Sequence, residues 1–168
     1  MEYFNIITHI ILIMSLGWYL ITNLQWYNYK LDRVVFKHHK WQWHITYFLS
    51  PIVLFYIIPE PYYAVYFYII YMASFVLWNK KLDRTLVLTS RVKRFLVILL
   101  FSIFAMTALC LSSPSCTNIL VFIPLILAYV ISTLLEKMFF ISFKHKGKQR
   151  VHSIVGLKTV AITASYGK

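Results

Sequence analysis

The clearest chemical pattern in the sequence is carried by its final residues. Residues 157–163 are rich in β-branched side chains and predict a short strand, which is followed by Gly167 and Lys168. In a phosphate-binding loop, backbone N–H groups surround the phosphates, glycine permits close approach and lysine neutralises phosphate charge. A strand leading into Gly-Lys is typical of the beginning of such a loop, although Ile162 stands where the general pattern has its first glycine.

The residues around this Gly-Lys pair make the pattern more specific. The segment Val160-Ala161-Ile162-Thr163-Ala164-Ser165-Tyr166-Gly167-Lys168 resembles the ATP-binding motif of the Mur ligases, which build the peptide stem of bacterial peptidoglycan. It is most similar to the branch that adds D-alanyl-D-alanine. In that family a strand is followed by Thr-Gly-Ser or Thr-Gly-Thr, a variable residue and Gly-Lys-Thr. The matching residues are Thr163, Ser165, Gly167 and Lys168, Tyr166 is at the variable position, and Ala164 replaces a glycine.

The apolar part of the chain is similar to the hydrophobic amino-terminal extension of that ligase in some bacteria, notably over residues 26–34. The resemblance implies an enzyme that uses ATP and Mg²⁺ to phosphorylate the carboxylate of a UDP-linked muramyl tripeptide, after which the D-Ala-D-Ala amine displaces phosphate. It also implies that Lys168 and the backbone of residues 163–167 contact the β- and γ-phosphates. Substrate and metal residues would lie further along the chain. We therefore expect no catalytic residue, no metal ligand and no ATP turnover in these 168 residues.

Histidines are the next candidates for chemistry. His38, His39 and His44 lie close together in sequence, and imidazole clusters ligate transition metals. Only Asp32 offers a further ligand nearby, so headgroup contacts are the favoured interpretation. His9 lies inside an apolar run, where an ionisable group is a candidate proton relay, but it is near the run's end and can stay neutral.

Two cysteines, Cys110 and Cys116, flank a short polar segment. A disulfide there would persist outside the cytoplasm, and two free thiols are an equally good interpretation. The apolar runs contain no paired carboxylates and no chain of charged residues, which are the usual signs of a pump or secondary transporter.

Composition decides which elements must position these residues. Apolar residues make up 60% of the chain and charged residues only 13%, whereas soluble domains are about half apolar and a quarter charged. Five apolar runs lack Lys, Arg, Asp and Glu, and most approach the length needed to cross a bilayer. They cover residues 3–24, 43–58, 62–78, 95–111 and 119–135. Pro51 lies inside the second run, and a neighbouring helix or Ser50 is expected to compensate for the backbone bond that proline removes.

The positions of the positive charges predict the orientation of these runs. All 17 Lys and Arg residues lie after the first run, after the third run or after the fifth run. They are Lys30, Arg33, Lys37 and Lys40; Lys80, Lys81, Arg84, Arg91, Lys93 and Arg94; and Lys137, Lys144, Lys146, Lys148, Arg150, Lys158 and Lys168. By the positive-inside rule, the amino terminus is outside and the carboxyl tail is cytoplasmic. The charges then face an anionic inner leaflet, so nucleic acid is not the expected partner.

The two basic connections share a short pattern. Residues 28–33 and 79–84 both read Asn-x-Lys-Leu-Asp-Arg. The pattern favours either two related helical hairpins with a common docking surface or, more simply, two basic helix ends, each with a local Asp-Arg pair.

These observations predict an all-α integral membrane protein with about five transmembrane helices that leads into the first strand and partial phosphate loop of an α/β domain. Residues 1–138 form the transmembrane domain, 139–156 a basic cytoplasmic linker and 157–168 the start of the ATP-binding domain. With the resemblance, we expect the membrane-anchoring part of a peptidoglycan-precursor ligase in the bacterial inner membrane, cut within its phosphate loop, near other cell-wall precursor enzymes. The alternative is a complete five-span scaffold or assembly protein without catalysis.

Overall fold

The structure is a computed structural model, and it describes residues 2–36, 40–59, 62–82, 85–111 and 122–153. Every regular element in these ranges is helical, and they contain no strand. The predicted strand at residues 157–163 and the phosphate-binding segment that follows lie outside the described residues. The chain divides into two compact units, Met1–Ser132 and Thr133–Lys168.

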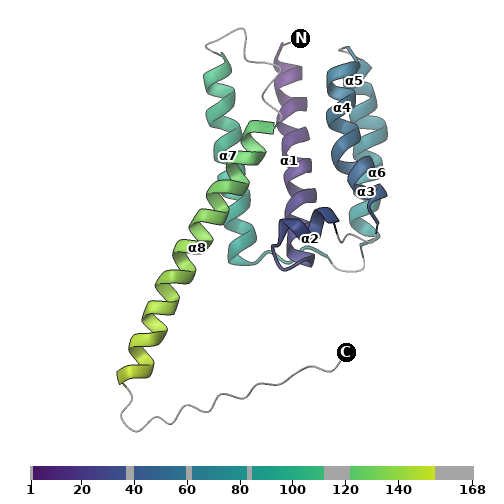
Figure 1. Ribbon diagram of the computed structural model, residues 1–168. Helices are drawn as coiled ribbons and strands as arrows, with labels where there is room; N and C mark the ends of the chain where they lie inside the picture. The colour runs from purple at the N-terminus through teal and green to yellow at the C-terminus, as the bar shows by residue number, and fades with distance from the viewer. Residues whose placement is uncertain (1, 37–39, 60–61, 83–84, 112–121, 154–168) are drawn as a thin grey trace. The chain divides into compact units, whose positions relative to one another are not determined.

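Helical segments make up most of the described chain (Figure 1). They are α1 (Glu2–Trp26), α2 (Leu31–Phe36), α3 (Gln42–His44), η1 (Ile45–Leu49), α4 (Ser50–Ile57), α5 (Tyr62–Val65), η2 (Tyr66–Tyr71), α6 (Met72–Lys80), α7 (Ser90–Leu111) and α8 (Phe122–Ser153). The elements η1 and η2 are π-helical, with wider turns than an α-helix.

Three helices are long and apolar enough to cross a membrane, namely Ile6–Trp26 in α1, Ser90–Leu109 in α7 and Ile123–Ser153 in α8. They match the first, fourth and fifth apolar runs of the sequence. The second and third runs are helical over residues 42–57 and 62–80, but a π-helical segment divides each of them into shorter α-helical pieces. Neither segment therefore forms one long continuous α-helix as α1 does.

The break at Pro51 is compensated by the neighbouring helix, as the sequence predicted. Proline has no N–H to offer the carbonyl of Tyr47, four residues earlier. The Tyr71 hydroxyl donates to that carbonyl at 3.2 Å, and the Tyr63 hydroxyl donates to the carbonyl of Pro51 at 3.0 Å. Ser50 does not take this role: its hydroxyl lies 3.1 Å from that of Tyr66.

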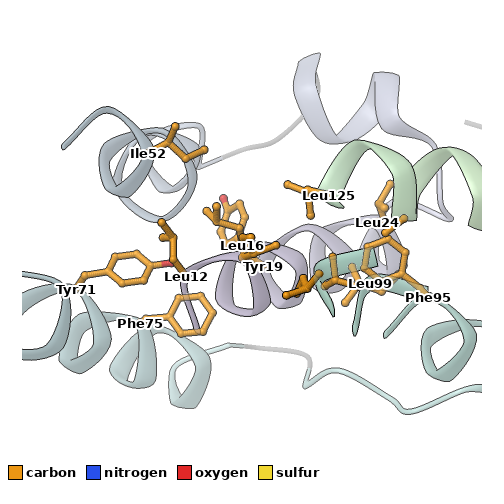
Figure 2. Packing of buried hydrophobic residues seen from close by; sticks show 14 of the residues in the cluster. Leu12, Leu16, Tyr19, Leu24, Ile52, Tyr71, Phe75, Phe95, Leu99 and Leu125 are labelled. Atoms are coloured by element: carbon orange, nitrogen blue, oxygen red, sulfur yellow. The ribbon is translucent and has the colours of Figure 1, made fainter. Parts of the chain in front are cut away.

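Helix α1 lies at the centre of the first unit. Leu12 and Leu16 are fully buried, and 56% of the apolar stretch of α1 is buried, against 28% in α7. Figure 2 shows Tyr71 and Phe75 on one side of α1, with Leu99 on another. A helix this enclosed must present a packing surface all round, which agrees with its nearly uninterrupted apolar sequence.

The contact between α1 and α7 depends on a residue without a side chain. Gly17 is buried, and a Cβ atom built on it would overlap Cδ2 of Leu99 in α7. Leu125, from the start of α8, also lies beside Gly17. The Ser102 hydroxyl of α7 donates to the Pro124 carbonyl of α8 at 3.1 Å, which joins these two helices within the first unit.

The second unit contains the remainder of α8, which continues as a helix to Ser153. The sequence alone predicts a span that ends at residue 135 and a basic linker over residues 139–156, with no helix assigned to that linker. Met, Phe, Lys, Gln and Arg fill this stretch, no proline interrupts it, and most of these residues favour a helix. Its basic residues are all exposed.

Candidate functional site at the carboxyl end of α1

Two basic connections of the first unit meet at the carboxyl end of α1. The Gln25 side chain holds the second connection: its Nε2 donates to the Val87 carbonyl at 2.9 Å, and the Val87 N–H donates to Gln25 Oε1 at 2.9 Å. This paired contact satisfies both polar backbone groups of Val87 in a segment that has no regular structure of its own. Residues 85–89 are therefore fastened to the last turns of α1.

The first connection turns sharply at the same place. Asn28 and Tyr29 have φ angles of 53° and 58°, in the left-handed region, and the Tyr29 N–H donates to the Leu24 carbonyl at 2.6 Å. This turn places the Tyr29 ring under the Arg91 guanidinium, at 3.8 Å from carbon Cζ to the ring centroid. The cation–π contact joins the first basic connection to the start of α7.

Basic side chains therefore gather around this end of α1. The described ones in the two connections and at the start of α7 are Lys30, Arg33, Lys40, Lys80, Lys81, Arg91, Lys93 and Arg94. Lys37 and Arg84 lie outside the described residues. We call this group the basic end of α1. A concentration of positive charge beside apolar helices is suited to anionic headgroups at a membrane surface.

His44 links three elements close to the basic end. Its Nε2 lies 2.9 Å from the Val34 carbonyl of α2, which only accepts, so Nε2 is the donor. Nδ1 lies 2.8 Å from the Tyr19 hydroxyl of α1, which donates to it when the ring is neutral. His44 thus fastens α2 to α1, a structural role that the favoured interpretation of the histidine cluster did not include.

An apolar pocket of about 400 Å³ opens beside His44. It is lined by Tyr19 and Leu20 of α1, Leu31, Val34 and Val35 of α2, and Trp41, His44, Ile45, Phe48 and Leu49 of the segment that follows. Its volume is within the range of about 300 to 1,000 Å³ that is usual for ligand pockets. The Leu31, Val34 and Val35 positions follow an i, i+3, i+4 spacing, which places them on one face of α2.

A ladder of aromatic rings runs along α5, η2 and α6, and the sequence analysis missed it. Tyr63, Phe67, Tyr71 and Phe75 are spaced four residues apart, and successive ring centroids lie 6.0, 5.3 and 5.7 Å apart. The next step, from Phe75 to Trp78, is 5.3 Å. An aromatic residue at every fourth position from 63 to 75 places these rings on one helix face, and this repeat in the sequence would have predicted the ladder.

The remaining predicted site residues are distributed as follows. Thr163, Ala164, Ser165, Tyr166, Gly167 and Lys168 lie outside the described residues, as do His38, His39 and Cys116, and the Cys110 side chain. His9 packs against Phe55 in an edge-to-face contact, with ring centroids 5.1 Å apart. Among the residues that the structure describes, no group of three or more His, Cys, Asp and Glu side chains could hold a metal ion.

The two copies of Asn-x-Lys-Leu-Asp-Arg differ in local structure. Asn28 occupies the left-handed turn after α1, whereas Asn79 lies within α6, where its Oδ1 accepts from Trp18 Nε1 at 3.3 Å. The asparagine that begins each copy therefore has a different structural role in the two connections.

A scan against protein-family models, a search of curated proteins and a search of solved structures each find no match to this chain.

Proposed function

We propose that the helical region anchors an ATP-dependent cell-wall precursor ligase at the inner leaflet of a bacterial membrane. In this proposal, residues 163–168 belong to the phosphate loop of the ligase, which adds D-Ala-D-Ala to a UDP-linked muramyl tripeptide. The membrane helices hold the catalytic domain next to the enzymes that transfer its product to a lipid carrier. ATP and Mg²⁺ would act in the complete protein.

The observation that carries the anchoring role is the convergence of the two basic connections at one end of α1. The Gln25–Val87 clamp and the Arg91–Tyr29 contact hold those connections together. Their charges then face the same membrane surface when the intervening chain, residues 42–80, crosses an even number of times, and its two apolar helical segments provide two crossings. This supports a hairpin of two further spans, with the amino terminus outside and the tail in the cytoplasm.

Hydrogen bonds within the hairpin also support its placement in a bilayer. The Tyr47 carbonyl, which the proline would expose to lipid, receives the hydroxyl of Tyr71, and the Pro51 carbonyl receives that of Tyr63. Backbone groups at membrane depth must be satisfied internally, because the hydrocarbon offers no water to replace the missing partner. The hairpin meets that requirement at Pro51, where the backbone lacks one hydrogen-bond donor.

A labelling experiment tests the topology. Cys110 and Cys116 are first replaced by Ser, and single cysteines are then introduced at Asn28, Glu60 or Thr85. We expect a membrane-impermeant maleimide to reach Glu60→Cys in intact cells, and Asn28→Cys and Thr85→Cys only in inverted vesicles. Labelling of Glu60→Cys and Thr85→Cys from the same side would contradict the five-span arrangement.

The ligase assignment needs a separate experiment. We expect the encoded protein to continue after Lys168 with Thr or Ser, and its membrane fraction to join D-Ala-D-Ala to the tripeptide with release of phosphate. Lys168→Ala should abolish that release while the protein stays in the membrane, because the lysine neutralises phosphate charge. Lys146→Ala, an exposed lysine of α8, is the matched control and should retain the activity.

A reading frame that closes after Lys168 would contradict the ligase assignment. It would favour the alternative, a self-contained membrane scaffold held together by the interhelical contacts around α1.

A further inference from the structure

The pocket between α1, α2 and η1 has the composition of a site for a hydrocarbon chain. Among its lining residues, polar side-chain atoms occur only at Trp41, which is mostly exposed, and at Tyr19 and His44. The polar atoms of those two side chains are already engaged, since Tyr19 and His44 bond to each other and His44 also bonds to the Val34 carbonyl. An apolar cavity whose polar atoms are occupied gives water few partners and favours an apolar guest.

The depth of the pocket suits one chain of a membrane lipid. Tyr19 lies seven residues before Trp26, the last residue of α1. At about 1.5 Å per residue, the inner wall is roughly 10 Å from the helix end. With the basic end of α1 at the headgroup level, the pocket lies at the depth of the first methylenes of an acyl chain. This placement rests on the orientation given under the proposed function.

Charge at the rim selects the headgroup. Lys30 directly precedes α2, and Lys40 directly precedes Trp41, which lines the pocket. The Lys40 ammonium lies 4.4 Å from the Trp43 ring centroid, and this cation–π contact holds it near the same segment. Arg33 adds a third positive charge, and Asp32 offsets only one of the three. The rim is therefore complementary to an anionic headgroup.

We propose that this pocket binds one acyl chain of an anionic glycerophospholipid, whose phosphate is contacted by Lys30 and Lys40. The bound acyl chain would fill the pocket between α2 and η1. It would also hold the first basic connection against the inner leaflet. The contacts of α2 with α1 through His44 leave the pocket formed without the lipid.

Native mass spectrometry of the purified full chain in detergent tests the site. The probes are phosphatidylglycerol and phosphatidylcholine with identical acyl chains, added at equal concentration. We expect one phosphatidylglycerol molecule per chain to be retained, at an affinity about tenfold above that for phosphatidylcholine. Equal retention of the two lipids by the unmodified chain would overturn the proposal.

Two pairs of variants locate the bound lipid. Val35→Trp places a large ring at the pocket wall and should reduce retention about tenfold. Val76→Trp is its control, since Val35 and Val76 are 55% and 46% exposed and only Val35 lines the pocket. Lys30→Gln with Lys40→Gln should remove the preference for phosphatidylglycerol, whereas Lys80→Gln with Lys81→Gln should keep it, because only the first two lysines directly precede residues that line the pocket.

The outcomes separate this site from the proposed function. Equal loss of the preference in both lysine pairs, or unchanged retention in Val35→Trp, would show general surface adsorption and would overturn the site. Because Lys30 and Lys40 are exposed, their variant tests the site even if Val35→Trp does not fold. If lipid retention follows the expected pattern but the reading frame closes after Lys168, the lipid site stands and the ligase assignment fails.

Discussion

The two sides of α1 are packed in different ways. On the side of η2 and α6, polar side chains of α1 reach across to the neighbouring helix. The pairs are Thr8 with Tyr68 at 3.1 Å, Ser15 with Tyr71 at 3.1 Å, and Trp18 with Asn79 at 3.3 Å. On the side of α7, Gly17 lets Leu99 approach the helix backbone, and the side chains that Figure 2 labels around it are apolar, with Phe95 beside Leu24 and Leu99.

This difference separates two ways of holding helices together in lipid. Lipid tails are as apolar as leucine, so helices associate through close packing and interhelical hydrogen bonds rather than through a hydrophobic driving force. The side of α1 that faces η2 and α6, called here the aromatic side, has directional hydrogen bonds that define which residues face each other. The α7 side depends on shape and should be the more sensitive to added volume.

The largest effect is expected from Gly17→Ala. The added Cβ overlaps Leu99 Cδ2, and Leu99 is fully buried, so it has little space to move. Overpacking of this kind costs about 1 to 3 kcal/mol of unfolding free energy. Titration of the micelle-bound protein with sodium dodecyl sulfate, followed by circular dichroism, measures the loss.

Gly147→Ala is the matched control, because a Cβ at Gly147 meets nothing within 4 Å. It should leave the free energy unchanged or slightly raise it, since alanine is the better helix former. In a Leu99→Ala background, Gly17→Ala should become neutral or stabilising. If its cost were the same in both backgrounds, the clash with Leu99 would not be the cause.

A smaller effect is expected from Tyr71→Phe. This change removes the hydroxyl that donates to the Tyr47 carbonyl, to which Pro51 has no N–H to offer. Interhelical hydrogen bonds in membrane proteins contribute about 0.6 kcal/mol on average and up to about 1.7. In the proposed membrane hairpin no water replaces the lost donor, so we expect a loss near the upper figure, measured by the same titration.

A second background tests this explanation. Pro51→Ala restores an N–H at position 51, which can bond to the Tyr47 carbonyl, so Tyr71→Phe should cost less there than in the unmodified chain. Tyr68→Phe removes a hydroxyl that pairs with Thr8 rather than with this carbonyl. Its cost should therefore not depend on whether the proline is present. Equal costs of Tyr71→Phe in both backgrounds would contradict the link between proline and tyrosine.

The sequence predicted the parts of this fold that depend on composition. Apolar runs without charge gave the three long helices of α1, α7 and α8, because burial and lipid both demand such runs. The need to compensate for Pro51 was also predictable, since proline always removes one backbone donor. The identity of the donor was not, because Tyr71 lies 24 residues from Tyr47 and only the packing brings them together.

The candidate site was less predictable. The positive charges near the end of α1 can be counted in the sequence. Their convergence depends on the Gln25–Val87 clamp, in which Gln25 bonds only to backbone atoms of Val87. Because every residue has such backbone atoms, the sequence does not reveal which one Gln25 contacts. The π-helical segments η1 and η2 also escaped prediction. They change how a helix turns without changing the apolar pattern that identifies it.

The smallest effect is expected from Thr8→Val, which keeps the shape of a buried side chain and removes its hydroxyl. The loss of the contact with Tyr68 should cost about 0.6 kcal/mol, the average for such bonds. Thr22→Val is the matched change, since Thr22 is equally buried but donates to the Trp18 carbonyl of its own helix at 2.7 Å. A bond within one helix adds nothing to helix association, so Thr22→Val should have little effect.

A double-mutant cycle should then find coupling between Thr8→Val and Tyr68→Phe but none between Thr22→Val and Tyr68→Phe. If the two threonine changes cost the same, the hydroxyl contacts on the aromatic side would not be what distinguishes it from the side packed against α7.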